Sequence, residues 1–134
     1  MILDSFFKES ATTNGVTVRV ITDFLDDQSV PAQKRWFWSY HIRIENHRDD
    51  AVKLLTRHWK ITDGTGKISH LDGDGVVGEQ PLLRPGGSHD YVSGCPLTTP
   101  SGTMEGHYRF LRDGGETFLV NIPLFELVAP ATAR

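Results

Sequence analysis

A glycine-rich segment has the spacing G-x-G-x-x-G, in Gly73-Asp74-Gly75-Val76-Val77-Gly78. This spacing is typical of loops that bind the pyrophosphate of a dinucleotide, where the glycines follow a strand and open a helix whose free N–H groups face the ligand. Here Pro81 and Pro85 follow closely, and two prolines exclude the interior of a long helix. The chain also shows no second strand–helix unit. We therefore reject a Rossmann-type domain and expect a loop whose glycines adopt positive φ and pack closely against a sheet.

An anion site without a helix stays open as a second interpretation of this loop. Consecutive backbone N–H groups in a glycine-rich turn can bind phosphate, and nearby cations can supply the opposite charge. Asp72 and Asp74 would oppose an anion, and Gly and Pro dominate turns for steric reasons alone, so a structural loop is favoured. The candidate phosphate-binding residues are Gly73, Gly75, Gly78, Arg57 and Arg84, with Lys60 as a further cation.

The other side chains that could do chemistry form no recognisable set. None of the histidines makes an H-x-H, H-x-x-H or H-E-x-x-H pair, and the single cysteine, Cys95, has no C-x-x-C partner. The histidines are His41, His47, His58, His70, His89 and His107. Ligands from different strands could still meet at a weak divalent site. A pairing of Cys95 with a histidine is conceivable, but no nucleophile motif surrounds the cysteine. We predict no catalytic residue, no metal ligand, no cofactor and no enzymatic activity.

Charge and hydropathy limit the classes of partner that the chain can bind. The net charge of −3 at pH 7 argues against a nucleic-acid partner and against a polybasic membrane anchor. The aromatic run Trp36-Phe37-Trp38 is therefore better explained by core packing than by base stacking. No stretch reaches the roughly 20 apolar residues of a membrane span. One cysteine permits no intrachain disulfide, and Asp4 and Lys8 interrupt the apolar start that a signal peptide needs, so we expect a cytoplasmic protein.

The elements that must position these residues are strands, because apolar residues recur with a period of two. Strands are expected at residues 16–24, 36–45, 52–61, 68–71, 88–93, 104–110 and 118–124, the last two as a hairpin around Asp113-Gly114-Gly115. Between Leu54 and Trp59 the apolar phase slips by one residue, which predicts a β-bulge near Leu55 or Thr56. The tail at residues 129–134 has no apolar pattern with which to pack.

This element count predicts the fold class. At 134 residues the chain is long enough for one domain, residues 1–134, with an ordered core of about 16–127. About seven short antiparallel strands without an amphipathic helix are typical of an all-β sandwich with an immunoglobulin-like or fibronectin type III-like shape.

Five blocks of sequence, in their order and spacing, resemble the ApaG family. They are Arg57-His58-Trp59-Lys60-Ile61-Thr62-Asp63, Gly73-Asp74-Gly75-Val76-Val77-Gly78-Glu79-Gln80-Pro81, Leu83-Arg84-Pro85-Gly86, Ser93-Gly94-Cys95-Pro96-Leu97 and Ser101-Gly102-Thr103-Met104-Glu105-Gly106-His107-Tyr108. The resemblance extends from about Val16 to Leu127. One departure is His89-Asp90-Tyr91, where the family usually has an aromatic residue at the first position, and this departure concerns the packing of that short strand.

The resemblance implies a fibronectin type III-like sandwich, in agreement with the strand count. The family is named for a gene that neighbours a diadenosine polyphosphate hydrolase, and it is linked genetically to cobalt resistance and magnesium efflux. In eukaryotes the domain is fused to F-box and polymerase-interacting proteins, which implies a role in recognition. Its glycine motif, which matches Gly73, Gly75 and Gly78, has been suggested to hold pyrophosphate. No enzymatic reaction is established for the family.

Two functional hypotheses follow. The first is a non-enzymatic binding module of unknown function, whose exposed edge and loops recognise a protein partner within magnesium and cobalt homeostasis. The same edge could pair two copies into a homodimer. The alternative is a pyrophosphate- or nucleotide-binding protein that uses the loop from Gly73 to Gly78. It predicts that Gly75→Val blocks binding without unfolding the protein.

Overall fold

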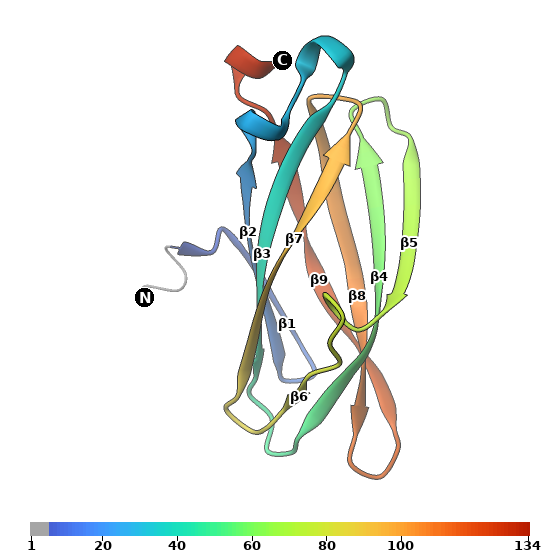
Figure 1. Cartoon of the computed structure of the whole chain (residues 1–134). Helices are drawn as coiled ribbons and strands as arrows, with labels where there is room; N and C mark the ends of the chain where they lie inside the picture. Colours follow the sequence, from blue (N-terminus) through green and yellow to red (C-terminus); the bar gives the residue numbers. More distant parts are fainter. Residues whose placement is uncertain (1–5) are drawn as a thin grey trace.

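Two antiparallel sheets packed face to face make up the computed structural model, which describes residues 6–134 (Figure 1). The strands are β1 (Glu9–Thr13), β2 (Val16–Phe24), β3 (Trp36–Asn46), β4 (Val52–Asp63), β5 (Ile68–Asp74), β6 (Leu82–Leu83), β7 (Ser88–Leu97), β8 (Ser101–Arg112) and β9 (Thr117–Val128). Three 3-10 helices, η1 (Asp26–Gln28), η2 (Pro31–Gln33) and η3 (Ala131–Ala133), complete the described part. None of the helices described in residues 6–134 is long and apolar enough to cross a membrane.

The strand order is β1-β2-β3-β7 in the first sheet and β5-β4-β8-β9 in the second, where β6 also pairs with β4. This arrangement confirms the predicted all-β sandwich. The described residues hold two strands beyond the predicted seven, β1 and β6. Both are short, and β6 lies within the Gly- and Pro-rich stretch that the sequence analysis treats as irregular.

The core forms where the apolar faces of the two sheets meet. Along β3 the side chains of Trp36, Trp38, Tyr40, Ile42 and Ile44 are buried, while the residues between them are partly exposed, as the period of two predicts.

A hydrogen bond also crosses the core between the two sheets. The hydroxyl groups of Tyr91 in β7 and Tyr108 in β8 lie 2.5 Å apart. Burial raises the pKa of both tyrosines, so both stay neutral and one donates to the other.

The predicted β-bulge is confirmed. The register between β4 and β8 shifts between Leu54 and Thr56, which keeps both Leu54 and Trp59 on the inner face. As a result His58 lies on the outer face. A second register shift, between Met104 and Gly106 of β8, places one extra residue in β9, where the buried positions change phase between Ile122 and Phe125.

Strand β1 and the C-terminal tail pack more than the sequence indicates. Strand β1 pairs with β2. It also contacts β9, where the Asn121 N–H donates to Thr13 Oγ1 (3.2 Å). The expectation that the tail lacks packing is wrong: Ala133 is buried, and the indole N–H of Trp36 donates to its carbonyl oxygen. A short apolar residue such as alanine gives no periodic signal, which is why the pattern misses this contact.

Candidate functional site

The glycine-rich segment begins inside β5 and ends in a tight turn. The Val76 N–H donates to Glu79 O (2.8 Å), and the Glu79 N–H donates back to Val76 O (3.0 Å). Between them Val77 and Gly78 have φ angles of 48° and 78°, as in a type I′ turn. The N–H groups of Val76 and Glu79 therefore bond within the turn and are not offered to a ligand.

Gly75 is required by its close contacts. Its N–H donates to Leu55 O (2.8 Å), its φ is +62°, and a Cβ atom added here would lie 2.2 Å from Glu79 O. A side chain at this position would therefore distort the turn. The sequence-based expectation that Gly75→Val leaves the fold intact does not fit this geometry, whereas a Cβ at Gly78 would meet open space.

Arg57 holds the end of β5. Its guanidinium donates to the carbonyl oxygens of Asp74 (2.9 Å) and Gly75 (2.8 Å). It passes close over Gly73, where an added Cβ would lie 2.7 Å from the guanidinium carbon. Gly73 therefore leaves room for the arginine. The structure brings Arg57, Gly73 and Gly75 together, but part of the arginine's donor capacity is used by the backbone.

Arg84 lies apart from this cluster. It directly follows β6, is exposed, and its carbonyl oxygen accepts a hydrogen bond from the Gly87 N–H (2.7 Å). It does not line the groove beside Arg57. Lys60 lies on the outer face of β4, opposite His70 of β5.

A groove of about 500 Å³ lies on the outer face of the second sheet, beside the end of β5. It is lined by Thr56, Arg57, His58, Asp72, Gly73, Asp74, His107 and Arg109. Of the five predicted phosphate-binding residues, only Arg57 and Gly73 line it. His58, His107 and Arg109 are also neighbours here, which the sequence does not indicate, because only the register between β4 and β8 places them together. The lining carries both signs of charge.

Three histidines form a row across this face. The ring of His58 in β4 stacks on His70 of β5 (centroids 5.2 Å apart) and on His107 of β8 (5.0 Å). Asp72 Oδ1 lies 2.6 Å from His58 Nδ1. The pKa of His107 is lowered, first by burial and then by the nearby His58 and Arg109. The strand order places His70 and His107 on opposite sides of His58, and in residues 6–134 no three His, Cys, Asp or Glu side chains converge to hold a metal ion.

Cys95 is buried in β7, opposite Trp38 of β3. Burial raises the pKa of its thiol to about 11. The thiol therefore stays protonated near neutral pH, and a protonated thiol is a poor nucleophile.

Strand β5 is a sheet edge that is exposed along nearly all of its length. Among the strands described in residues 6–134 it pairs with β4 alone, and Ile68 and Leu71 are 50% and 57% exposed. Figure 1 shows β5 at the outer margin of the molecule, with no described element beyond it.

Two flanking hydrogen bonds determine which main-chain groups of β5 are free. The Asp63 N–H donates to Lys67 O and the Gly75 N–H donates to Leu55 O. Hydrogen-bonded pairs alternate along an antiparallel ladder. Ser69, Leu71 and Gly73 therefore direct their N–H and C=O groups to β4. The groups of Ile68, His70 and Asp72 point away from the sheet.

Two other edge strands, β9 and β7, are contacted or interrupted by other groups. β9 receives contacts from Thr13 and from Asn14, whose side-chain amide donates to Leu119 O (3.3 Å). β7 contains Pro96, which lacks an N–H. At the other end of β7, His89 Nε2 lies 3.6 Å from Glu79 Oε2 of the glycine-rich turn.

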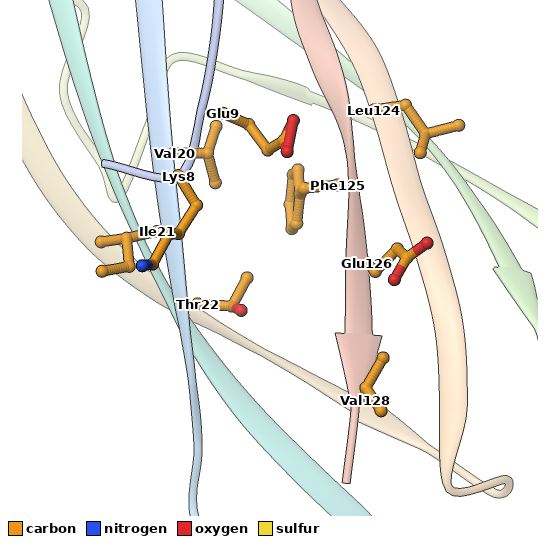
Figure 2. Close-up of a pocket in the computed structure, with 9 residues that line it drawn as sticks. All are labelled: Lys8, Glu9, Val20, Ile21, Thr22, Leu124, Phe125, Glu126 and Val128. Carbon is orange, nitrogen blue, oxygen red and sulfur yellow. The ribbon is translucent and has the colours of Figure 1, made fainter. Parts of the chain in front are cut away.

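A hollow of about 370 Å³ remains between β2 and β9, where β1 no longer covers β2 (Figure 2). Lys8, Glu9 and Glu126 lie around it together with apolar side chains such as Leu124 and Phe125. The charges are mixed and do not converge on one point in the view of Figure 2, so the hollow defines no ligand chemistry.

Comparison with known proteins agrees with this architecture. A family model described as the ApaG domain matches residues 26–112. Protein ApaG of Mesorhizobium japonicum is 49% identical over 124 residues, which cover 92% of this chain and 95% of the relative. Protein ApaG of Rhizobium meliloti is 50% identical over the same shares. The crystal structure of a Bordetella pertussis protein described as ApaA has a TM-score of 0.83 at 42% identity, covering 87% of this chain and 94% of that one.

Proposed function

The chain belongs to the ApaG domain family, and from this premise we propose that it is a non-enzymatic interaction module that binds an extended strand of a protein partner along the free edge of β5. The observation that carries the proposal is the set of unpaired main-chain groups of Ile68, His70 and Asp72. An added strand gains affinity from main-chain hydrogen bonds and specificity from side chains on alternating faces.

The surroundings of this edge support strand recognition. Leu71, more than half exposed, would be covered by an apolar side chain of the partner. Asp72 on the opposite face would favour a basic or neutral residue there. Arg57 binds the carbonyl groups of Asp74 and Gly75, so the accessible edge ends where the glycine-rich turn begins.

The non-enzymatic part of the proposal is supported by the chemistry of the candidate side chains. The Cys95 thiol is buried and protonated, and the histidines of the outer face stack on one another, with His58 bonded to the carboxylate of Asp72. We place the partner within magnesium and cobalt homeostasis and the protein in the cytoplasm. The first assignment rests on the genetic association that the family resemblance implies, and the second rests on cysteine usage.

Matched variants test this proposal. His70→Pro removes an outward N–H without removing a bond to β4, and Leu71→Ser removes the exposed apolar side chain. Val92→Ser is the control, because Val92 is 59% exposed on β7, an edge strand of the first sheet. In affinity capture from cell extract, proteins retained by the wild type and by Val92→Ser should be lost with both β5 variants. Equal retention by all four proteins, each checked for folding by circular dichroism, would sink the proposal.

Binding of pyrophosphate or a nucleotide is the second candidate function. The guanidinium groups of Arg57 and Arg109 line one groove, which favours an anion, whereas Asp72 and Asp74 on the same groove oppose it. Calorimetry with pyrophosphate and ATP tests this candidate directly. Heat of binding that disappears in Arg109→Ala would support it, and no heat with the wild type would exclude it.

A further inference from the structure

We propose that the strand bound by β5 is β5 of a second copy of this chain, paired antiparallel about a two-fold axis at Leu71. This inference rests on the proposed function and names its partner. It follows from three properties of β5 together: its free main-chain groups, its exposed leucine and its alternation of charge.

The free main-chain groups restrict the register. Only residues whose N–H and C=O groups point outward can form the hydrogen-bonded pairs of a new antiparallel ladder. These residues are Ile68, His70 and Asp72, as the bonds that flank β5 indicate. Pairing is therefore restricted to registers in which even-numbered residues oppose even-numbered residues.

Among these registers the one centred on Leu71 is self-complementary. It places His70 opposite Asp72 of the other copy, twice by symmetry, in hydrogen-bonded pairs. It also places the two Leu71 side chains directly opposite each other in a non-hydrogen-bonded pair, where side chains approach most closely. Both leucine side chains, each 57% exposed in a single copy, would then be buried against each other.

The two neighbouring registers are worse. Moving the axis by one residue toward Ile68 places His70 opposite His70 and leaves Leu71 opposite Ser69. Moving it the other way sets Asp72 against Asp72, and like charges directly opposite each other are destabilising. The sequence of β5 thus selects one register out of three.

The edge is also open enough to accept a second sheet edge. In Figure 1 β5 runs along the outer margin, with no described element beyond it. Pairing would join two second sheets into one continuous sheet across the two-fold axis, while the contacts of β1 with β9 keep the opposite side closed.

Sedimentation of the purified full chain from micromolar to millimolar concentration tests the dimer. The mass should rise from that of one 15.0 kDa chain toward twice that value. His70→Pro and Leu71→Ser should stay monomeric at concentrations where the wild type and Val92→Ser form dimers. A wild type that stays monomeric throughout would overturn the inference, as would a dimer that both β5 variants retain.

Disulfide trapping tests the register without relying on a destabilising variant. In Leu71→Cys the two thiols would face each other across the axis, within reach of a disulfide, whereas in Ser69→Cys each thiol would face Gly73. Mild oxidation should link Leu71→Cys into a covalent dimer at least tenfold faster than Ser69→Cys. The native Cys95 is 3% exposed and should not compete. Equal rates for the two variants would overturn the register.

The two proposals fail separately in these experiments. If the chain is monomeric but His70→Pro still loses proteins captured from extract, the self-pairing inference is wrong and strand recognition stands. If the chain dimerises through β5 but no captured protein depends on that edge, the partner is the second copy alone.

Discussion

Cys95 and His107 each lie in an environment that is less polar than water, and this changes the chemistry expected from their residue types. For Cys95 burial favours the neutral thiol, and for His107 burial and nearby cations favour the neutral imidazole. Both effects remove reactive or charged species at neutral pH. These two side chains are therefore poor candidates for a nucleophile and for a general acid at neutral pH.

Cys95 should resist alkylation in the folded protein. With a pKa of about 11 and a 3% exposed side chain, it offers little thiolate at pH 8. Iodoacetamide at pH 8 should modify the native chain at least tenfold more slowly than the chain in denaturant, followed by mass spectrometry. Comparable rates in the two states would show that the thiol is accessible.

His107 should titrate below the ordinary histidine value of 6.5, measured by NMR as a function of pH. The unfolded chain then binds more protons than the folded chain between the two pKa values. The contribution of His107 to the free energy of unfolding is therefore complete above about pH 6.5 and decreases as the pH falls through this window. In His58→Ala the pKa of His107 should rise, because the electrostatic effect of His58 that lowers it is removed. An unchanged pKa in that variant would contradict the described stacking.

At the scale of the strands, some features could be predicted from the sequence and others could not. The period of two in β3 and the phase slip in β4 are visible in the sequence, so the core strands and the bulge could be predicted. Strands β1 and β6 could not, because short strands with few buried side chains lack a periodic signal. The row of His70, His58 and His107 could not be predicted either, since those residues become neighbours only through the register of three strands.

The two hydroxyl groups of Tyr91 and Tyr108 should be coupled in their effect on the free energy of unfolding. Tyr91→Phe leaves the hydroxyl of Tyr108 buried without this partner, which should cost about 1–3 kcal/mol in the free energy of unfolding. The double variant Tyr91→Phe/Tyr108→Phe removes both hydroxyls and should recover part of that loss. Urea denaturation measures both values. A double variant with fully additive losses would contradict a direct bond between the two.

The two turn glycines should differ in their tolerance of a side chain. Gly75→Ala places a methyl group against Glu79 O at a positive φ, so we expect a loss of more than about 2 kcal/mol. Gly78→Ala meets open space and should lose only about 1 kcal/mol from its left-handed backbone. Thermal unfolding of the two variants checks this order. Equal losses would mean that the turn does not pack as described.

At the scale of the whole molecule, the sandwich is closed on one side and open on the other. β1 covers β9 on the closed side, and the glycine-rich turn, held by Arg57, lies between β5 and β7 on the open side. The motif that resembles a nucleotide-binding loop thus has a structural role at the end of a free edge. The exposed edge of β5 is the feature that this architecture leaves available for binding.

Amide hydrogen exchange along β5, resolved by NMR at low protein concentration, is the most direct test of whether this edge is free. The amides of Ser69 and Leu71, bonded to β4, should exchange slowly, while those of His70 and Asp72 should exchange at least tenfold faster. Raising the concentration of the chain should then slow His70 and Asp72 selectively, as the second copy binds. Equal protection of all four amides at low concentration would show that the edge is already covered, and would contradict a free edge on β5.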